Sequence, residues 1–248
     1  MSDWKAKRFW TDVSVRSFPD GYSIYLDDRE LKTPTKSTLR VPTKALADEI
    51  AKEWHDQEGE IDPSKMPFTR SANSAIDKVR PQHGDVVAML AEYGDTDLLC
   101  YRADSPAGLV ERQSQIWDPL LDWAADALGA RLTPQVGIMH KAQAARDLDQ
   151  LRNRVAQLDE FELVAFHDLV GLSGSLIIGF AVFEGAHDPL EMWDASRVDE
   201  LWQQDQWGVD DEVLFDFIAK TIAASPNKKS FNLIITTSFH PPSDLDLQ

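Results

Sequence analysis

The first forty residues alternate between apolar and polar positions with a period of two, which predicts β-strands. The apolar positions are Phe9, Val13, Val15, Tyr22, Ile24 and Leu26. Asp20-Gly21 and Asp27-Asp28 have the composition of turns, Leu31–Thr33 reads as a third strand, and Leu39–Val41 reads as a fourth that ends at Pro42. We therefore expect hairpins that form a small antiparallel sheet of four or five strands.

The period changes to that of a helix at Thr43. Apolar side chains then fall on one helical face, at Leu46, Ala47, Ile50, Ala51 and Trp54. From about residue 69 to residue 224 the chain reads as helices separated by short breaks. The predicted fold class is α+β, with a small antiparallel β-rich domain at residues 1–42 and a larger, mainly α-helical domain at residues 43–226. Residues 227–248 form a divergent tail, which is either disordered or packed as a strand.

Two prolines bear on the predicted helices. Asp188-Pro189, with Glu191 three residues after the cap, predicts a helix from Pro189 to about Gln206, because the carboxylates can accept hydrogen bonds from free amides at the helix start. Pro119 interrupts an apolar stripe and either kinks one helix or begins another. We favour the kink.

The segment Leu163–Phe183 is apolar and about long enough to cross a bilayer. His167 and Asp168 lie inside it, its flanks are acidic, and no Lys or Arg anchors either end. The segment is therefore predicted to be a buried central helix without stable membrane insertion. A membrane-associated scaffold that uses this segment is the remaining alternative.

Charge excludes one class of partner. The 248 residues include 42 acidic and 25 basic side chains, a net charge of -17, which repels nucleic-acid phosphates. The single cysteine, Cys100, cannot form an internal disulfide, and the N-terminus lacks the apolar core of a signal peptide. These features favour a protein of a reducing cytoplasm that does not bind nucleic acid.

The search for catalytic chemistry yields one alternative. The six histidines show no metal-ligand spacing, so neither a metal nor a cofactor is expected. Asp95, Asp97 or His167 could serve a small-molecule enzyme with a pocket between helices. The favoured interpretation is structural, with the aspartates capping a helix and His167 as a hydrogen-bonded core histidine.

The last quarter of the chain indicates protein binding instead. Trp193, Trp202 and Trp207 cluster beside acidic residues, and aromatic anchors with an acidic rim are typical of binding hot spots. For each ring taken singly the core is the favoured interpretation, and Trp54 and Trp193 fit core stripes best.

An ordered set of motifs carries a resemblance to a known family. The set comprises Lys7-Arg-Phe-Trp10, Leu31-Lys-Thr-Pro34, Val41-Pro-Thr, Glu53-Trp54, Asp62-Pro-Ser-Lys-Met-Pro67, Thr96-Asp-Leu-Leu-Cys-Tyr101, Trp117-Asp-Pro119 and Gln203 through Trp207-Gly208. In this order the motifs resemble the assembly chaperone of the ATP synthase catalytic head that binds the α subunit, found in mitochondria and α-proteobacteria. The resemblance runs from Lys7 to about Ala224, and the sequence after Ser225 departs from it.

The resemblance implies a non-catalytic, two-domain protein. Such a protein holds the free ATP synthase α subunit, shields its assembly surface from aggregation and releases it when the β subunit arrives. The family associates a functionally important glutamate with the helix around Leu-Trp-Gln, which places Glu200 at the matching position, with Glu212 as a weaker candidate. The expected partner-binding residues are Glu200, Trp202, Gln203, Trp207 and Glu212. Self-association and the trigger for release are left open.

Overall fold

The computed structural model describes residues 7–207, which form two compact units. The first unit runs to His83 and the second begins at Gly84. The predicted boundary between residues 42 and 43 falls inside the first unit. The change of period at Thr43 therefore marks the change from strands to a helix, and this helix packs on the strands instead of starting the helical unit.

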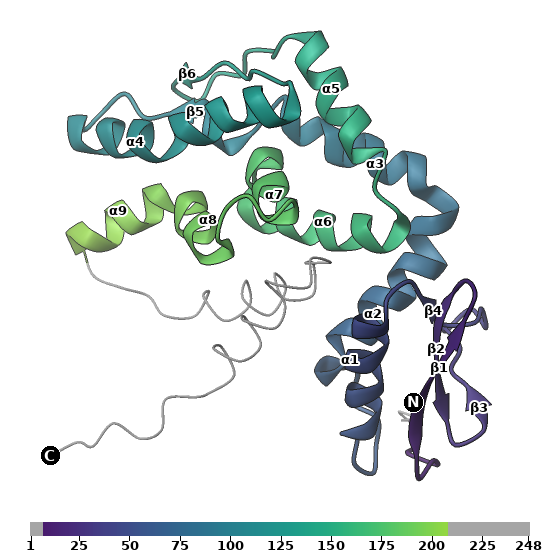
Figure 1. Cartoon of the computed structure of the whole chain (residues 1–248). Helices are drawn as coiled ribbons and strands as arrows, with labels where there is room; N and C mark the ends of the chain where they lie inside the picture. Colours follow the sequence, from purple (N-terminus) through teal and green to yellow (C-terminus); the bar gives the residue numbers. More distant parts are fainter. Residues whose placement is uncertain (1–6, 208–248) are drawn as a thin grey trace, which may run out of the picture. The chain divides into compact units, whose positions relative to one another are not determined.

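The first unit contains a four-stranded antiparallel sheet (Figure 1). Its strands are β1 (Val13–Phe18), β2 (Gly21–Leu26), β3 (Arg29–Glu30) and β4 (Arg40–Val41), and β2 pairs with the other three. The two predicted turns connect β1 to β2 and β2 to β3. Gly21 has a φ of 136°, and a Cβ there would lie 2.5 Å from the carbonyl oxygen of Val41, so the first turn requires glycine.

Helix α1 (Lys44–His55) covers this sheet and completes the core of the first unit. Ile24 and Leu39 from the sheet and Ala47 and Ile50 from the helix are all fully buried. Trp10 is also buried and lies with its ring centroid 5.1 Å from that of Trp54.

Helix α2 (Pro67–Ser74) follows, and a buried carboxylate holds its start. Glu53 accepts hydrogen bonds from the backbone N–H groups of Phe68 and Thr69 at 2.6 and 2.8 Å, and from the Thr69 hydroxyl at 2.6 Å. Burial raises the pKa of Glu53, and these donors oppose that rise. Helical turns at Ala75–Val79 and Arg80–Gln82 end the unit.

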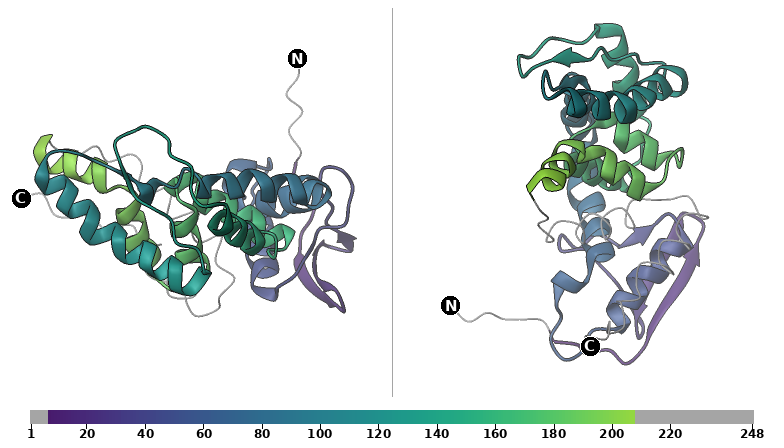
Figure 2. Two further views of the ribbon diagram at one scale, coloured as in Figure 1. Left: turned by 90° about the horizontal axis from the view of Figure 1, so that it is seen from above. Right: turned by 90° about the vertical axis from the view of Figure 1, so that its left-hand side faces the viewer.

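The described part of the second unit, residues 84–207, is mainly helical, with one short parallel pair of strands (Figure 2). Its helices are α3 (His83–Ala91), α4 (Ala107–Trp123), α5 (Ala145–Val155), α6 (Glu160–Ser173), α7 (Leu176–Phe183), α8 (Pro189–Ser196) and α9 (Val198–Trp207). The strand pair is β5 (Tyr101–Arg102) with β6 (Gln135–Val136). The α+β class predicted from the sequence is confirmed.

The segment Leu163–Phe183 is two helices, so the prediction of one central helix is wrong. Gly174 has a φ of 68° and ends α6, and the Ser175 hydroxyl accepts a hydrogen bond from the Ile178 backbone at 3.0 Å to begin α7. The expected burial is nevertheless present, because Leu176 to Val182 are all buried. Among residues 7–207 no helix is long and apolar enough to cross a membrane.

The helix predicted from Pro189 to about Gln206 is also broken. Asp188 caps its start as expected, accepting hydrogen bonds from the backbone of Leu190 and Glu191 at 2.9 and 3.3 Å. Arg197 leaves helical geometry with φ −117° and ψ 24°, and the chain continues as α9. Helix α4, by contrast, runs through Pro119 without a second start, which excludes the alternative of two helices there.

Candidate protein-binding site

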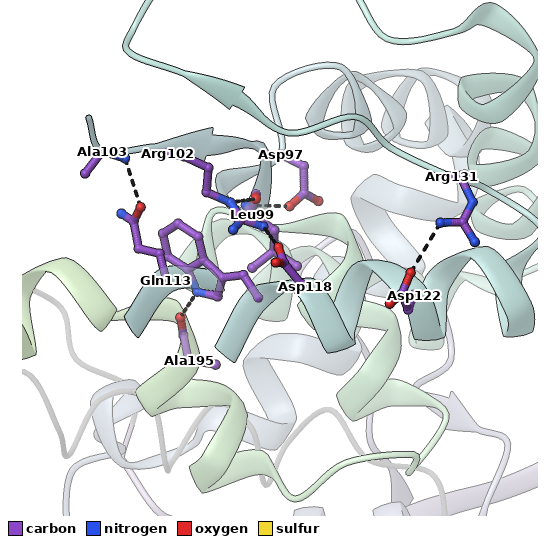
Figure 3. A network of polar contacts seen from close by, with 10 residues as sticks. Asp97, Leu99, Arg102, Ala103, Gln113, Asp118, Asp122, Arg131 and Ala195 are labelled. Carbon is purple, nitrogen blue, oxygen red and sulfur yellow. Dashed lines mark hydrogen bonds and ion pairs between the residues drawn. The ribbon is translucent and has the colours of Figure 1, made fainter. Parts of the chain in front are cut away.

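Helix α4 lies between strand β5 and helices α8 and α9 and contacts all three. The Trp117 side chain is 1% exposed, and its Nε1–H donates a 2.7 Å hydrogen bond to the carbonyl oxygen of Ala195 in α8. Buried Gln113 accepts from the backbone of Ala103 at 2.8 Å and donates to Asp199 of α9 at 2.7 Å. Figure 3 shows the Gln113–Ala103 contact on one side of α4 and the contact with Ala195 on the other. Helices α8 and α9 therefore have a fixed position within the second unit.

Arg102 ties strand β5 to the same helix. Its Nη2 lies 2.7 Å from Asp118 Oδ1, its Nε–H donates to the carbonyl oxygen of Leu99 at 2.8 Å, and its guanidinium lies 5.3 Å from the Trp117 ring centroid. Arg102 is buried, so this ion pair is shielded from water on one side. The β5–β6 pair and α8–α9 are thus both anchored to α4, on different sides of it (Figure 3).

Asp97, one of the residues considered for an enzyme, is a buried structural cap. Its carboxylate accepts hydrogen bonds from the Leu99 backbone at 3.0 Å, the Ser175 hydroxyl at 2.8 Å and the Ile177 backbone at 3.1 Å. Burial raises the pKa of Asp97 to about 6, and the hydrogen bonds from these donors oppose the rise. Its oxygens are therefore occupied in joining the start of α7 to the turn before β5, as the structural interpretation expected.

Asp95 and His167 have other surroundings. Asp95 accepts a 2.7 Å hydrogen bond from the Gln143 backbone and lies 3.3 Å from His140 Nε2. His167 is exposed on α6 beside Asp168, whose hydrogen bond raises the pKa of His167. The prediction of a core histidine is wrong, because Leu163, Phe166 and Val170 form the buried face of α6 and His167 lies off it. Within residues 7–207 no group of three or more His, Cys, Asp or Glu side chains could hold a metal ion.

Helix α9 has two faces with different environments. One face is fixed to α4: Asp199 bonds to Gln113, Asp205 pairs with Arg112 at 2.6 Å, and the Trp202 ring lies against Gly108. A Cβ on Gly108 would come within 2.6 Å of Trp202 Cη2, so the ring sits directly on the helix backbone. Glu200 and Gln203, three residues apart, are exposed on the other face.

The structure thus separates the five residues predicted to bind the partner. Glu200 and Gln203 are free of the contacts with α4 and share one surface of α9. Trp202 is partly buried in the contact with α4, so its role includes holding α9 in place. Trp207 is the last residue of α9, and only its backbone is described. Glu212 lies outside the described residues.

Replacement of Trp202 by alanine is expected to lower the free energy of unfolding by about 2 kcal/mol, because a partly buried indole loses its packing on Gly108. Urea denaturation followed by circular dichroism measures this loss. Glu200→Gln is the matched control on the exposed face and should change the value by less than about 0.5 kcal/mol. Equal stability of the two variants would show that Trp202 does not hold α9.

Charge distinguishes the two units. Residues 1–83 contain 14 acidic and 14 basic side chains, whereas residues 84–207 contain 22 acidic and 8 basic ones. The described part of the second unit therefore carries a net charge of -14, and the exposed face of α9 belongs to it. Such a charge speeds encounter with a basic partner and repels an acidic one.

Sequence reasoning missed the residues that position this site. Gln113 and Arg102 are polar groups whose burial depends on contacts between distant segments, and no local pattern marks them. Three exposed apolar residues, Val136, Ile138 and Met139, also escaped notice. They lie in a stretch without helical or strand periodicity, where the only signal was the apolar run itself, interrupted by Gly137.

Comparisons with known proteins give the family. The family model described as "ATP12 chaperone protein" matches residues 7–125. A solved structure, the crystal structure of Atp12 from Paracoccus denitrificans, is 47% identical to this chain, with a TM-score of 0.84, over 94% of this chain and 100% of that one. This chain belongs to the ATP12 chaperone family.

Two further proteins are similar to this chain over most of its length. The mitochondrial protein atp12 of Schizosaccharomyces pombe is 26% identical over 214 residues, 82% of this chain and 74% of that protein. The Atu1473 protein of Agrobacterium tumefaciens, described as a candidate chaperone, is 35% identical with a TM-score of 0.80, over 92% of this chain and 85% of that one. The likeness to the ATP12 proteins therefore spans both units.

Proposed function

We propose that this ATP12-family protein is a non-catalytic assembly chaperone that binds the free α subunit of ATP synthase. It shields the surface through which the α subunit contacts its neighbours and hands the subunit over during assembly of the catalytic head. Because two of the similar solved structures come from bacteria, we place this binding in the bacterial cytoplasm.

The observation that carries this proposal is the likeness to Paracoccus denitrificans Atp12 along 94% of the chain, at 47% identity. A match of that extent and identity covers the α4–α9 arrangement as well as the sheet. Within this arrangement the exposed α9 face leaves its side chains available to a partner, since the opposite face is held by Gln113, Arg112 and Gly108.

The roles of the residues in capture follow from their environments. The strongly acidic second unit sets the encounter rate and the selectivity for a basic or neutral surface. Glu200 offers an exposed carboxylate that accepts hydrogen bonds from a cationic or N–H donor on the partner, and Gln203 beside it can both donate and accept. Trp202 holds α9 against α4, so the two polar side chains are presented in a fixed orientation. Trp207 and Glu212 extend the proposed contact beyond this pair.

The enzyme alternative loses support from the positions of its residues. The Asp97 carboxylate is engaged by three donors and fully buried, and His167 lies exposed beside Asp168. Among the described residues, the buried Asp97 and the exposed His167 do not share a surface that a substrate could contact. A binding role makes no such demand, because it requires only an accessible surface held in a fixed geometry.

The proposal predicts that Glu200→Gln weakens capture of the α subunit at least tenfold, because the substitution removes the charge and one strong acceptor while preserving shape. The measurement is the Kd of the purified variant for separately expressed ATP synthase α subunit from the same source. Glu191→Gln, which changes an exposed glutamate of α8 in the same way, is the matched control and should bind within about twofold of the wild type.

Three results would count against this assignment. Equal affinity of both variants would remove Glu200 from the binding surface. Equal weakening by Glu191→Gln would assign the effect to net charge and not to one directed contact. Binding of the β subunit as tightly as the α subunit would contradict the proposed selectivity.

A further inference from the structure

The second unit exposes an apolar loop that no contact within the described structure explains. Val136 is 68% exposed, Ile138 is 91% exposed and Met139 is 81% exposed, and the three lie within four residues that begin with the last residue of strand β6. Single exposed apolar residues are ordinary, but a contiguous group of this kind marks an interaction surface.

The stem of this loop is firmly held. Gln143 forms reciprocal hydrogen bonds with Thr133, accepting from its backbone N–H at 2.8 Å and donating to its carbonyl oxygen at 3.0 Å. The Gln143 backbone donates to Asp95 Oδ1 at 2.7 Å, so the closed stem is also tied to the turn before β5. The two ends of the segment from residue 133 to residue 143 are thereby kept together.

The middle of the loop is braced as well. The Gly137 N–H donates to the carbonyl oxygen of Arg102 at 2.9 Å, which continues the β5–β6 pairing. Directly after Met139, His140 lies between Asp95 and Tyr101, with both contacts at 3.3 Å. Within this frame the side chains of Val136, Ile138 and Met139 stay exposed. Their position is therefore set by the backbone before any partner binds, which lowers the entropy lost on association.

Charge limits what this loop can hold. The described part of its unit carries a net charge of -14, so a second copy of the unit and an anionic lipid surface would both be repelled. The occupant that suits both the apolar loop and the negative charge of its unit is an apolar protein surface surrounded by neutral or basic residues. A chaperone of the ATP12 family requires such an occupant, since the assembly surface of an unassembled subunit is apolar and aggregation-prone.

We propose that Val136, Ile138 and Met139 form a second docking element for the protein client, one that inserts into an apolar depression on its assembly surface. The identity of this client rests on the proposed function above. Helix α4 anchors both docking elements, the loop through the contact of Asp118 with Arg102 of β5 (Figure 3) and the α9 face through the hydrogen bond from Gln113 to Asp199. The client is held at two separated places, with apolar contact at the loop and polar contact at α9.

The test compares two double variants of the full chain. Ile138→Ser/Met139→Ser removes the apolar side chains of the loop, and Met89→Ser/Leu190→Ser removes two exposed apolar side chains elsewhere in the same unit. Binding to separately expressed ATP synthase α subunit is measured by biolayer interferometry, together with light scattering of α subunit diluted from denaturant. The loop variant should lose at least tenfold in affinity and fail to suppress scattering, while its melting temperature stays within about 1 °C of the wild type. The control should bind within about threefold of the wild type.

The outcomes separate this inference from the proposed function. If the wild type captures the α subunit and the loop variant does so equally well, the docking element is wrong and the proposed function stands. If the wild type does not capture the α subunit, both fail. If the loop variant instead turns a dimer into a monomer in sedimentation, or loses binding to phosphatidylcholine vesicles that the wild type shows, the loop serves self-association or a lipid surface and the inference is overturned.

Discussion

Replacement of Asp97 by alanine is expected to lower the free energy of unfolding by about 4 kcal/mol. The substitution leaves the N–H groups of Leu99 and Ile177 and the hydroxyl of Ser175 buried without their acceptor, and each unpaired buried group costs about 1–3 kcal/mol. Urea denaturation followed by far-ultraviolet circular dichroism at pH 7.5 measures the change. Asp168→Ala, which removes an aspartate from the partly exposed surface of α6, is the control and should cost less than about 1 kcal/mol. A loss at position 97 no larger than that of the control would contradict the capping role.

The same residue gives a pH dependence with a definite sign. Burial raises the pKa of Asp97 to about 6 in the folded chain, above the ordinary value of 3.8, so the folded state binds this proton more tightly than the unfolded state does. The resulting stabilisation is full below about pH 4 and is lost as the pH rises through 6. Between pH 5 and pH 7.5 it falls by roughly 1.5 kcal/mol.

Asp97→Asn isolates this contribution, because asparagine has a similar shape and does not ionise. Its NH₂ group faces an N–H donor, so the variant is less stable than the wild type at every pH. Its deficit should be larger at pH 5 than at pH 7.5 by roughly 1.5 kcal/mol, since only the wild type gains from the proton. A deficit that is the same at both pH values, or that grows toward pH 7.5, would show that the pKa of Asp97 is not raised.

Replacement of Trp117 by alanine is expected to cost about 3–5 kcal/mol and to weaken capture of the client. The side chain is 1% exposed, so its removal leaves a large cavity between α4 and α8 and also deletes the hydrogen bond to Ala195. Loss of that contact weakens the attachment of α8 to α4 and with it the support of α9, which carries Glu200. Denaturant unfolding and the Kd for the α subunit measure the two consequences.

Trp117→Phe separates packing from the hydrogen bond. It retains most of the ring but leaves the carbonyl oxygen of Ala195 unpaired, for an expected cost of about 1–2 kcal/mol. Trp123→Phe, at a partly exposed position of the same helix, is the matched control and should cost less than about 1 kcal/mol. Unchanged stability of Trp117→Phe would show that this hydrogen bond does not hold α8.

The sequence patterns predicted the local structure well where the local signal is strong. The two turns of the sheet and the cap at Asp188 follow from residue types whose preferences act over three or four positions. Burial of Leu176 to Val182 likewise follows from a run of apolar side chains. In these places the local preference and the tertiary packing agree.

The predictions that failed depended on interactions between distant segments. The segment Leu163–Phe183 was predicted as one helix, although the pair Gly174-Ser175 is a helix end followed by a cap, fixed in the structure by Asp97. No Gly or Pro marks the break at Arg197. The break comes two residues after Ala195, whose carbonyl oxygen accepts the hydrogen bond from Trp117. The change of period at Thr43 marks the change from strands to helix α1 within the first unit, because α1 packs on the sheet that precedes it.

The candidate site was predictable in part. The Trp-rich acidic stretch pointed to Trp202 and the family resemblance pointed to Glu200, but only the contact with Gly108 assigns Trp202 to the face that packs on α4. The exposure of Ile138 and Met139 could not be inferred, because an apolar pair in a sequence is more often buried than presented to solvent.

The most direct test of the central claim is the solubility of ATP synthase α subunit expressed alone or together with this chain, with the β subunit treated in parallel. We expect the α subunit to become soluble and to co-purify with this chain, and we expect the β subunit to do neither. Insolubility of the α subunit in the presence of folded, abundant chain would contradict the claim, as would equal capture of both subunits.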